Sequence, residues 1–504
     1  MHDDEAEYWS RLESTQRQWY PGFVKQVSSQ LGAEQDEGQV AVITFQDGVK
    51  PHVRVFTKSK DLRRYLDSNS PPPSSPNVPE CRRMFVLEGL PKKFIQLLGS
   101  RLRVPPSFFA AHWVQPGKFV ASLLNQTLRS YDNQTRFTLA SPKLHRAKIQ
   151  GEPGDDADPV YFMQSSITRQ LGRDSLFGEF EGPLWSYEIV SFWSACDRGS
   201  WDALLLVDPP LGNSVMWTDD PRPRLVVHES PENGNVPGIS KDGWSQDGSW
   251  YPPFPVGGAG EAPGMKSVFD DLVRLYPSQQ YQSTADPITC TDICKQLVLS
   301  AWTARLRVLE AEVIRKQYEM SIGPRTPTFN PRTRPPPAWT HPWTDEEFGR
   351  LVRAKSVLEG TKTTLFYNLD ALGVGGERQM GEEWETAAWK SLQNALLTLK
   401  TRVDIMSEAY TLAVSVRESI VANAQARQVG YLTSLATLFI PVSFIAAVFS
   451  MGGDYAAGER KFYVFWAISL PIAVVASCLY LFGGFILGVL RKYSVTREGE
   501  KSPV

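Results

Sequence analysis

The longest apolar stretches of this chain lie near its C-terminal end. Residues 428–453 contain no charged side chain, and neither do residues 462–490. Each stretch is longer than the roughly 20 residues that a helix needs to cross the hydrocarbon core of a bilayer. Only residues 454–461 separate them. The pattern therefore predicts two transmembrane helices, 428–453 and 462–490, joined by a short outer loop, 454–461.

A connection this short places both chain termini on the same side of the membrane. More than 400 residues precede the first stretch, and the acidic start 1–5 does not have the apolar core of an export signal. The tail 491–504 is basic, as expected for a segment that stays in the cytoplasm. We expect an integral membrane protein with two spans in contact with lipid and both termini cytoplasmic, in either the plasma membrane or an organelle membrane.

One long helix is predicted to lead into the first apolar stretch. Between Glu382 and Phe449 the only proline is Pro441 and the only glycine is Gly430. Apolar residues recur at a mean spacing of about 3.5, which is typical of a coiled-coil seam. The seam consists of Leu392, Leu396, Leu399, Val403, Met406, Tyr410, Ala413, Ile420 and Ala424. Its partners are either the two preceding helices, in an antiparallel bundle, or other copies of the chain, and both can apply.

Two amphipathic helices precede the long one, so residues 289–427 form a helical stalk region. The apolar stripe of the first consists of Leu299, Trp302, Leu306, Leu309 and Val313. That of the second consists of Phe348, Leu351, Leu358, Leu365, Leu369 and Leu372. Thr344 and Glu347 form a predicted capping box at the start of the second helix, and residues 373–376 end it.

Residues 1–288 have the pattern of a mixed α/β domain. Alternating or β-branched runs predict strands at 40–45, 53–56, 185–192 and 201–207, with Asp47-Gly48 as a turn between the first two. The prolines before Ser107 predict a helix start. Two insertions, 67–80 and 208–264, are rich in Pro or Gly. The second contains too few apolar residues to build a core, so we expect it to be disordered.

Composition and charge argue against several functions. The net charge is −2 and the chain has no basic cluster, so its electrostatics give no support for nucleic-acid binding. Cys290 and Cys294 lie four residues apart without a second pair of ligands nearby, so buried thiols are expected rather than a zinc site. No nucleophile elbow, zincin motif or phosphate loop is present. We therefore predict no enzymatic activity and no cofactor.

The first apolar stretch has a distinctive sequence. Residues 435–453 run Leu-Ala-Thr-Leu-Phe-Ile-Pro-Val-Ser-Phe-Ile-Ala-Ala-Val-Phe-Ser-Met-Gly-Gly. This run resembles the pore helix of the fungal CorA-like magnesium transporter family, where an apolar run, Pro, an aliphatic residue, Thr or Ser, Phe and Ile lead to Gly-Met-Asn. Residues 465–471 are similar to the family's second span. Residues 108–112 and 201–209 are similar to segments of its cytosolic domain.

The resemblance implies a CorA-like α+β membrane protein. In that architecture an N-terminal mixed α/β cytosolic domain is followed by a long stalk helix, which continues into the first of two transmembrane helices. It also implies self-association as a homopentamer, with Mg²⁺ as both the transported and the regulatory ion. The acids available for a regulatory site are Asp270, Asp271, Asp345 and Glu346. They match no motif.

The resemblance also assigns roles inside the predicted pore. Ser443 would contribute a ring of hydroxyls, and Ile440, next to Pro441, a hydrophobic constriction. Without the resemblance, a hydrogen bond from the Ser443 hydroxyl to the Phe439 carbonyl of the same helix is the simpler expectation. Both interpretations are open from the sequence.

The predicted outer mouth departs from the family pattern. Where the family has Gly-Met-Asn, this chain has Ser450-Met451-Gly452, followed by Gly453. The missing amide is the group that would hold a hydrated magnesium ion through its water shell. In the outer loop, Asp454 and Glu459 are candidates for concentrating cations.

The function predicted from these features is a divalent-cation channel, for Mg²⁺ before other ions, driven by the membrane potential. Two alternatives are a CorA-derived membrane scaffold or sensor that does not conduct, and a channel for Zn²⁺, Ni²⁺ or Co²⁺. The first alternative follows from the missing amide, since a chain that has lost its ion-binding mouth can keep the two-helix anchor.

Overall fold

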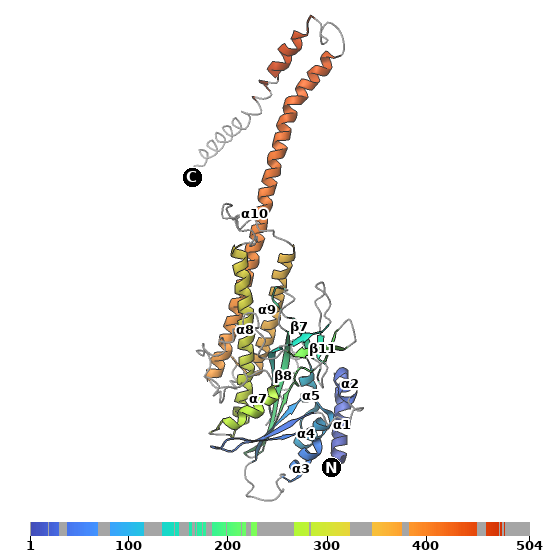
Figure 1. Cartoon of the computed structure of the whole chain (residues 1–504), viewed down its shortest axis with the longest axis vertical. Coiled ribbons are helices and arrows are strands. Elements are labelled where there is room, and N and C mark those ends of the chain that lie inside the picture. Colours follow the sequence, from blue (N-terminus) through green and yellow to red (C-terminus); the bar gives the residue numbers. More distant parts are fainter. Residues whose placement is uncertain are drawn as a thin grey trace, which may run out of the picture. The chain divides into compact units, whose positions relative to one another are not determined.

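The computed structural model divides the chain into two compact units, Met1–Glu408 and Ala409–Val504. The residues that the structure describes are 2–18, 20–29, 38–68, 81–114, 134–145, 147–150, 161–163, 167, 169–173, 175–177, 184–197, 199–212, 214–217, 223–228, 267–281, 284–322, 345–374, 383–450, 460–472, 474–475 and 478. The first unit combines a mixed α/β sheet domain with long helices, as the sequence predicts (Figure 1).

The sheet of the first unit has 11 strands in the order β2-β1-β3-β9-β8-β7-β6-β10-β11-β5, with β4 paired to β8. The β3–β9 pair is parallel and the other pairs are antiparallel. The strands are β1 (Val40–Thr44), β2 (His52–Phe56), β3 (Arg82–Glu88), β4 (Gln134–His145), β5 (Ala147–Ile149), β6 (Tyr161–Met163), β7 (Gln170–Arg173), β8 (Leu184–Asp197), β9 (Ser200–Val207), β10 (Ser214–Trp217) and β11 (Pro223–His228). All four strands predicted from the sequence are confirmed.

Strand β1 is buried on both faces rather than on alternate residues. Val40 and Val42 belong to the core on one side. On the other side Phe45, just after the strand, packs edge-on against Tyr276, with 5.8 Å between the ring centroids. A strand covered on both faces carries apolar residues throughout, which explains the difference from the expected alternation. The turn to β2 is confirmed, with Gly48 at a φ of 69°. Such a positive φ favours glycine because it has no Cβ.

Five helices cover the face of the sheet that includes Val40 and Val42. They are α1 (His2–Gln16), α2 (Pro21–Ser29), α3 (Ser59–Ser68), α4 (Lys92–Leu102) and α5 (Pro106–Trp113). The predicted helix start is confirmed, because Pro106 occupies the first turn of α5. The Tyr8 hydroxyl donates to the Val104 carbonyl at 2.8 Å, and Gly99 leaves room for the Tyr8 ring. These contacts fasten α1 to the core.

The prediction of disorder throughout residues 208–264 is wrong, because β10 and β11 lie inside this insertion. Val215 of β10 and Val226 of β11 pack with Ile149 and Leu171 in a small separate core. The insertion supplies only a few apolar residues, but neighbouring strands supply the rest, which a count within the insertion cannot reveal. Residues 229–266, residues 69–80 and the predicted cap at Thr344 lie outside the described residues.

Three long helices follow the sheet: α8 (Asp292–Ile322), α9 (Asp345–Ala371) and α10 (Glu383–Phe449). The predicted stripes of α8 and α9 are buried, except for Phe348, which is exposed. Gly373 follows α9 with a φ of 68° and ends the helix, as predicted. A shorter helix, α7 (Val268–Leu275), precedes them. The long helix predicted from Glu382 is confirmed almost to the residue.

Ion pairs define the directions of the three long helices. Lys295 of α8 contacts Glu385 at 2.8 Å and Glu310 contacts Arg402 at 3.7 Å, so α8 and α10 run parallel. Lys355 of α9 contacts Asp404 at 3.2 Å and Glu359 contacts Lys400 at 2.7 Å, so α9 runs antiparallel to α10. The three helices therefore alternate in direction, which is the antiparallel bundle within the chain that the sequence allows.

Both α8 and α9 hydrogen-bond to one residue of β4. Asn368 of α9 accepts from the Ala140 backbone N–H and donates to its carbonyl, each at 2.8 Å. Trp302 of α8 donates its Nε1–H to the same carbonyl at 2.8 Å. The Asn368 amide thus pairs with Ala140 as a neighbouring strand would.

The second unit contains the remainder of α10 and a helical segment at 463–472. The coiled-coil seam is buried from Leu392 to Tyr410, but Ile420 and Ala424 further along it are exposed. Within the part of the chain that the structure describes, no helix combines the length and the hydropathy needed to cross a membrane.

Candidate functional site

The residues predicted to line an ion path lie at the end of α10 and just beyond it. Ile440, Pro441 and Ser443 are inside the helix, and Ser450 is in the turn that follows. The remaining predicted residues, Met451, Gly452, Gly453, Asp454 and Glu459, lie outside the described residues. The structure therefore places the constriction and hydroxyl candidates on one helix and does not describe the mouth.

Ile440 and Ser443 share one side of α10. They are three residues apart, which brings side chains onto the same face of a helix, and both are exposed. Within the described residues, Ser443 makes no hydrogen bond with the Phe439 carbonyl. By contrast, Ser469 of the following helical segment donates to the Phe465 carbonyl at 2.7 Å. The Ser443 hydroxyl therefore lies open on the surface of the unit.

The acids considered for a regulatory metal site do not come together. Asp270 and Asp271 belong to α7, where Asp271 contacts Arg274 at 3.1 Å. Asp345 and Glu346 start α9, where Glu346 contacts Arg350 at 2.6 Å. Among the described residues, no group of three or more His, Cys, Asp or Glu side chains has the arrangement of a metal site.

Cys290 and Cys294 are both buried and unpaired to each other. Burial raises the pKa of each thiol to about 12, so both are protonated at neutral pH. Only the thiolate is an effective nucleophile or metal ligand. The interpretation of these residues as buried thiols is confirmed.

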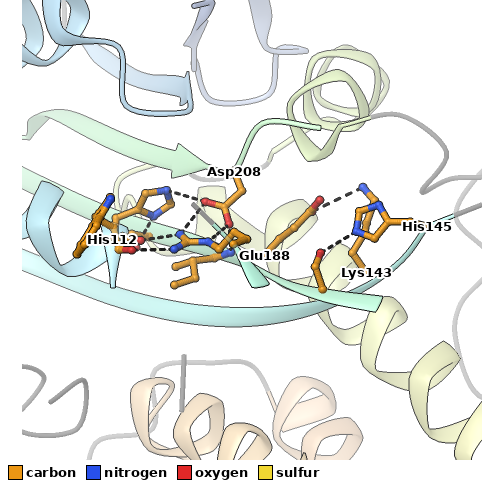
Figure 2. A network of polar contacts seen from close by, with 10 residues as sticks. His112, Lys143, His145, Glu188 and Asp208 are labelled. Carbon is orange, nitrogen blue, oxygen red and sulfur yellow. Dashed lines mark hydrogen bonds and ion pairs between the residues drawn. The ribbon is translucent and has the colours of Figure 1, made fainter. Parts of the chain in front are cut away.

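The sheet domain contains a buried polar network that the sequence analysis did not predict, in which Asp208 is the central carboxylate (Figure 2). Arg169 donates to Asp208 through Nε at 2.6 Å and through Nη2 at 2.9 Å, and the Ile189 backbone N–H adds a bond at 2.8 Å. Burial opposes ionisation, but the charge of Arg169 and the contact with His112 outweigh it and lower the pKa of Asp208 to about 2. Asp208 is therefore ionised.

Arg169 also fastens α5 to this network. Its Nη2 donates to the His112 carbonyl at 2.7 Å and its Nη1 to the Trp113 carbonyl at 2.8 Å. These are the carbonyls at the end of α5, which lack partners within the helix. One guanidinium thus satisfies a helix end and a buried carboxylate together.

The network contains the three residue types of a hydrolase triad, as His112, Ser191 and Asp208. His112 Nδ1 lies 2.9 Å from the Ser191 hydroxyl, and its Nε2 lies 3.2 Å from Asp208 Oδ1 without completing a hydrogen bond. Burial lowers the pKa of His112 despite the opposing effect of Asp208, so the imidazole is neutral. All three side chains are buried, Ser191 completely. A substrate cannot reach this serine, so the arrangement holds the fold together and supplies no nucleophile.

The network also contains Glu188 of β8, close to Lys143 of β4. The distance from Lys143 Nζ to Glu188 Oε2 is 3.6 Å, and Oε2 accepts no hydrogen bond. Burial, with a further contribution from the charge of Asp208, raises the pKa of Glu188 to about 7, although Lys143 acts in the opposite direction. A sequence signal for this site would have been weak, since Glu188 is the one charged residue between Leu184 and Cys196, in a run rich in aromatic and β-branched residues.

Comparison with known proteins gives only distant similarity. No family model matches the chain, and no curated protein matches it. The CorA magnesium transporter from Methanocaldococcus jannaschii is similar in structure, with 11% sequence identity, a TM-score of 0.35, and coverage of 88% of this chain and 96% of that one. The full-length CmaX protein is similar with 13% identity, a TM-score of 0.32, and coverage of 91% and 100%. At TM-scores this low, neither similarity supports a conclusion about family or function.

Proposed function

We propose that the chain is a CorA-like channel for divalent cations, with Mg²⁺ first among the candidates. In this proposal residues 428–453 and 462–490 cross the membrane, and both termini lie in the cytoplasm. Five copies surround a path lined by the first of these helices. The support comes from the sequence of 435–453 and from the course of α10.

One observation carries the proposal: α10 continues without a break from a packed bundle into a charge-free stretch in which most of the described large apolar side chains are exposed. Ile440, Phe444 and Val448, four residues apart, are 67%, 69% and 51% exposed. Covering such a face is favourable, at about 25 cal/mol for each Å² of apolar surface removed from water. Lipid and further copies of the same helix are surroundings that would cover it.

The proposed path needs no energy source besides the membrane potential. A divalent cation that moves toward an inside-negative compartment gains about 4.6 kcal/mol per 100 mV, twice the value for a single charge. Ser443 would offer hydroxyl oxygens to the hydrated ion, and Ile440 would form a narrow apolar ring that opens and closes by wetting.

Ion uptake into liposomes tests the proposal. Purified protein is reconstituted with a Mg²⁺-sensitive dye inside the vesicles, and an inside-negative potential is imposed. We expect Mg²⁺ entry above that of empty vesicles, and entry that increases with the potential. Gly452→Asn should lower the Mg²⁺ concentration needed for half-maximal entry, because its amide can hold first-shell waters. Gly452→Ala, which adds a Cβ without an amide, is the matched control and should not.

The second candidate, a non-conducting membrane scaffold or sensor, is favoured by the sequence Ser450-Met451-Gly452, which lacks that amide. It predicts uptake equal to that of empty vesicles for the wild type and for Gly452→Asn. The mass of the purified assembly gives an independent test, since a monomer or dimer cannot form a five-fold path. Competition by Zn²⁺, Ni²⁺ and Co²⁺ in the same vesicles identifies the preferred ion.

A further inference from the structure

Glu188 is a buried carboxylate that the proposed ion path does not use. It lies in the middle of β8, its side chain is 2% exposed, and it faces Lys143 without a hydrogen bond to Oε2. Figure 2 shows it between the group around Asp208 and His112 and the group around Lys143 and His145. A buried carboxylate whose Oε2 accepts no hydrogen bond is poorly compensated when ionised and better accommodated when protonated.

The charged groups near Glu188 come from several elements. Lys143 on β4 favours the ionised form, and so does Arg169, which precedes β7. Asp208, at the end of β9, disfavours it. Lys143 also acts on Glu88 of β3, so its charge is shared between two carboxylates. His112 of α5 is neutral and adds no charge.

We propose that Glu188 is a proton-binding site that makes the packing of the paired strands β4 and β8 depend on pH. Ionisation of Glu188 places a second negative charge beside Asp208 in the interior, and protonation removes it. Burial raises the pKa of Glu188 to about 7, which brings this change into the physiological range. The ligand of this site is the proton alone.

The position of Glu188 connects this proton to the long helices. Glu188 lies opposite Ser141 in the β4–β8 register, and the next pair is Ala140 with Ile189. Ala140 is the residue that Asn368 and Trp302 hold. Ile189 donates its N–H to Asp208 at 2.8 Å. Looser packing of the β4–β8 pair would therefore weaken the attachment of α8 and α9 to the sheet.

The pH dependence of unfolding tests the proton site without any transport measurement. The folded-state pKa of Glu188 is raised, so its contribution to stability is present at low pH and is lost as pH rises toward and through about 7. Glu188→Gln copies the protonated side chain. Relative to this variant, the unfolding equilibrium constant of the wild type should rise roughly 10- to 100-fold between about pH 5 and pH 8. A ratio that stays constant over this range would overturn the proposal.

Two further variants separate Glu188 from its neighbours. Lys143→Met removes the cation that favours ionisation, so the same step should move to higher pH. His145→Gln is the matched control, because it changes another polar residue of β4, one that contacts Ser186 at 2.7 Å, and the step should remain in place. Hydrogen exchange of residues 134–145 gives the local readout. The wild type should exchange faster than Glu188→Gln by a larger factor at pH 8 than at pH 5; a factor that is the same at both pH values would contradict the link to β4.

Discussion

The two parts of α10 carry similar apolar patterns and meet different surroundings within one chain. Up to Tyr410 the seam residues are buried, and the helix exchanges ion pairs with α8 and α9. From Leu412 to Val448 most of the described large apolar side chains are exposed, Leu412 at 68%. The hydrophobic pattern therefore indicates that a helix will bury a face, but it does not indicate which partner will cover it.

The first part of α10 packs against helices of the same chain, so its contribution to stability can be measured on the single chain. Its contacts are made by residues of the same chain, so substitutions there should change the free energy of unfolding at any protein concentration. Contacts of the second part with other copies would make the effect of substitutions depend on concentration.

The largest effect is expected at the buried pair Lys295–Glu385, which joins the starts of α8 and α10. The side chains are 3% and 4% exposed and 2.8 Å apart. Burial disfavours the charge of Lys295, but Glu385 and Asp292 outweigh this and raise its pKa. Lys295→Met leaves the Glu385 carboxylate buried without its cation, and we expect a loss of about 3–5 kcal/mol. Denaturant unfolding measures it.

The double variant Lys295→Met, Glu385→Leu is the control for this prediction. Replacing both members of a buried ion pair by apolar residues is often neutral or stabilising, so the double variant should recover the stability that the single variant loses. If Lys295→Met unfolds at the same denaturant concentration as the wild type, α10 is not held to α8 by this pair.

The second prediction compares one leucine from each part of α10. Leu396 is 1% exposed, and Leu396→Ala should cost about 2–5 kcal/mol because it leaves a cavity in the bundle. Leu412→Ala removes the same atoms from an exposed position, and in dilute detergent it should change stability by no more than about 0.5 kcal/mol.

Assembly supplies the contrasting measurement for this pair. In concentrated samples Leu412→Ala should weaken self-association, followed by mass or by cross-linking, while Leu396→Ala should change unfolding equally at all concentrations. Equal costs for the two variants in dilute solution would show that the second part of α10 is packed within the chain, and the contrast between the two parts would be lost.

The sequence predicts the long helices well because their signals are local. Proline and glycine mark the ends of α5 and α9, and the spacing of apolar residues identifies the buried stripes of α8, α9 and the first part of α10. Phe348 fits the stripe of α9 and is nevertheless exposed. A stripe defined by spacing includes residues beyond the end of the partner surface, and spacing alone cannot locate that end.

The buried network could not be predicted, because its members are distant in sequence. Arg169, Asp208 and His112 come from three separate segments, and the 11-stranded sheet brings them together. Asp208 carries the visible signal of a strand end, since Pro209 follows it. That signal indicates where β9 stops and contains no information about the guanidinium that neutralises the carboxylate. The predicted residues of the mouth stay predictions, because the structure does not describe them.

The smallest effect concerns the attachment of the packed helices to the sheet. Asn368→Leu removes both hydrogen bonds to Ala140 and leaves the buried N–H of Ala140 unpaired. We expect the free energy of unfolding to fall by about 1–3 kcal/mol. Trp302→Phe is the matched variant. It removes one donor from a carbonyl that keeps its bond to Asn368, so the loss of that hydrogen bond should cost about 0.5–1.5 kcal/mol. If the two costs prove equal, the Ala140 N–H finds another partner when Asn368 is absent, and Asn368 does not replace a strand.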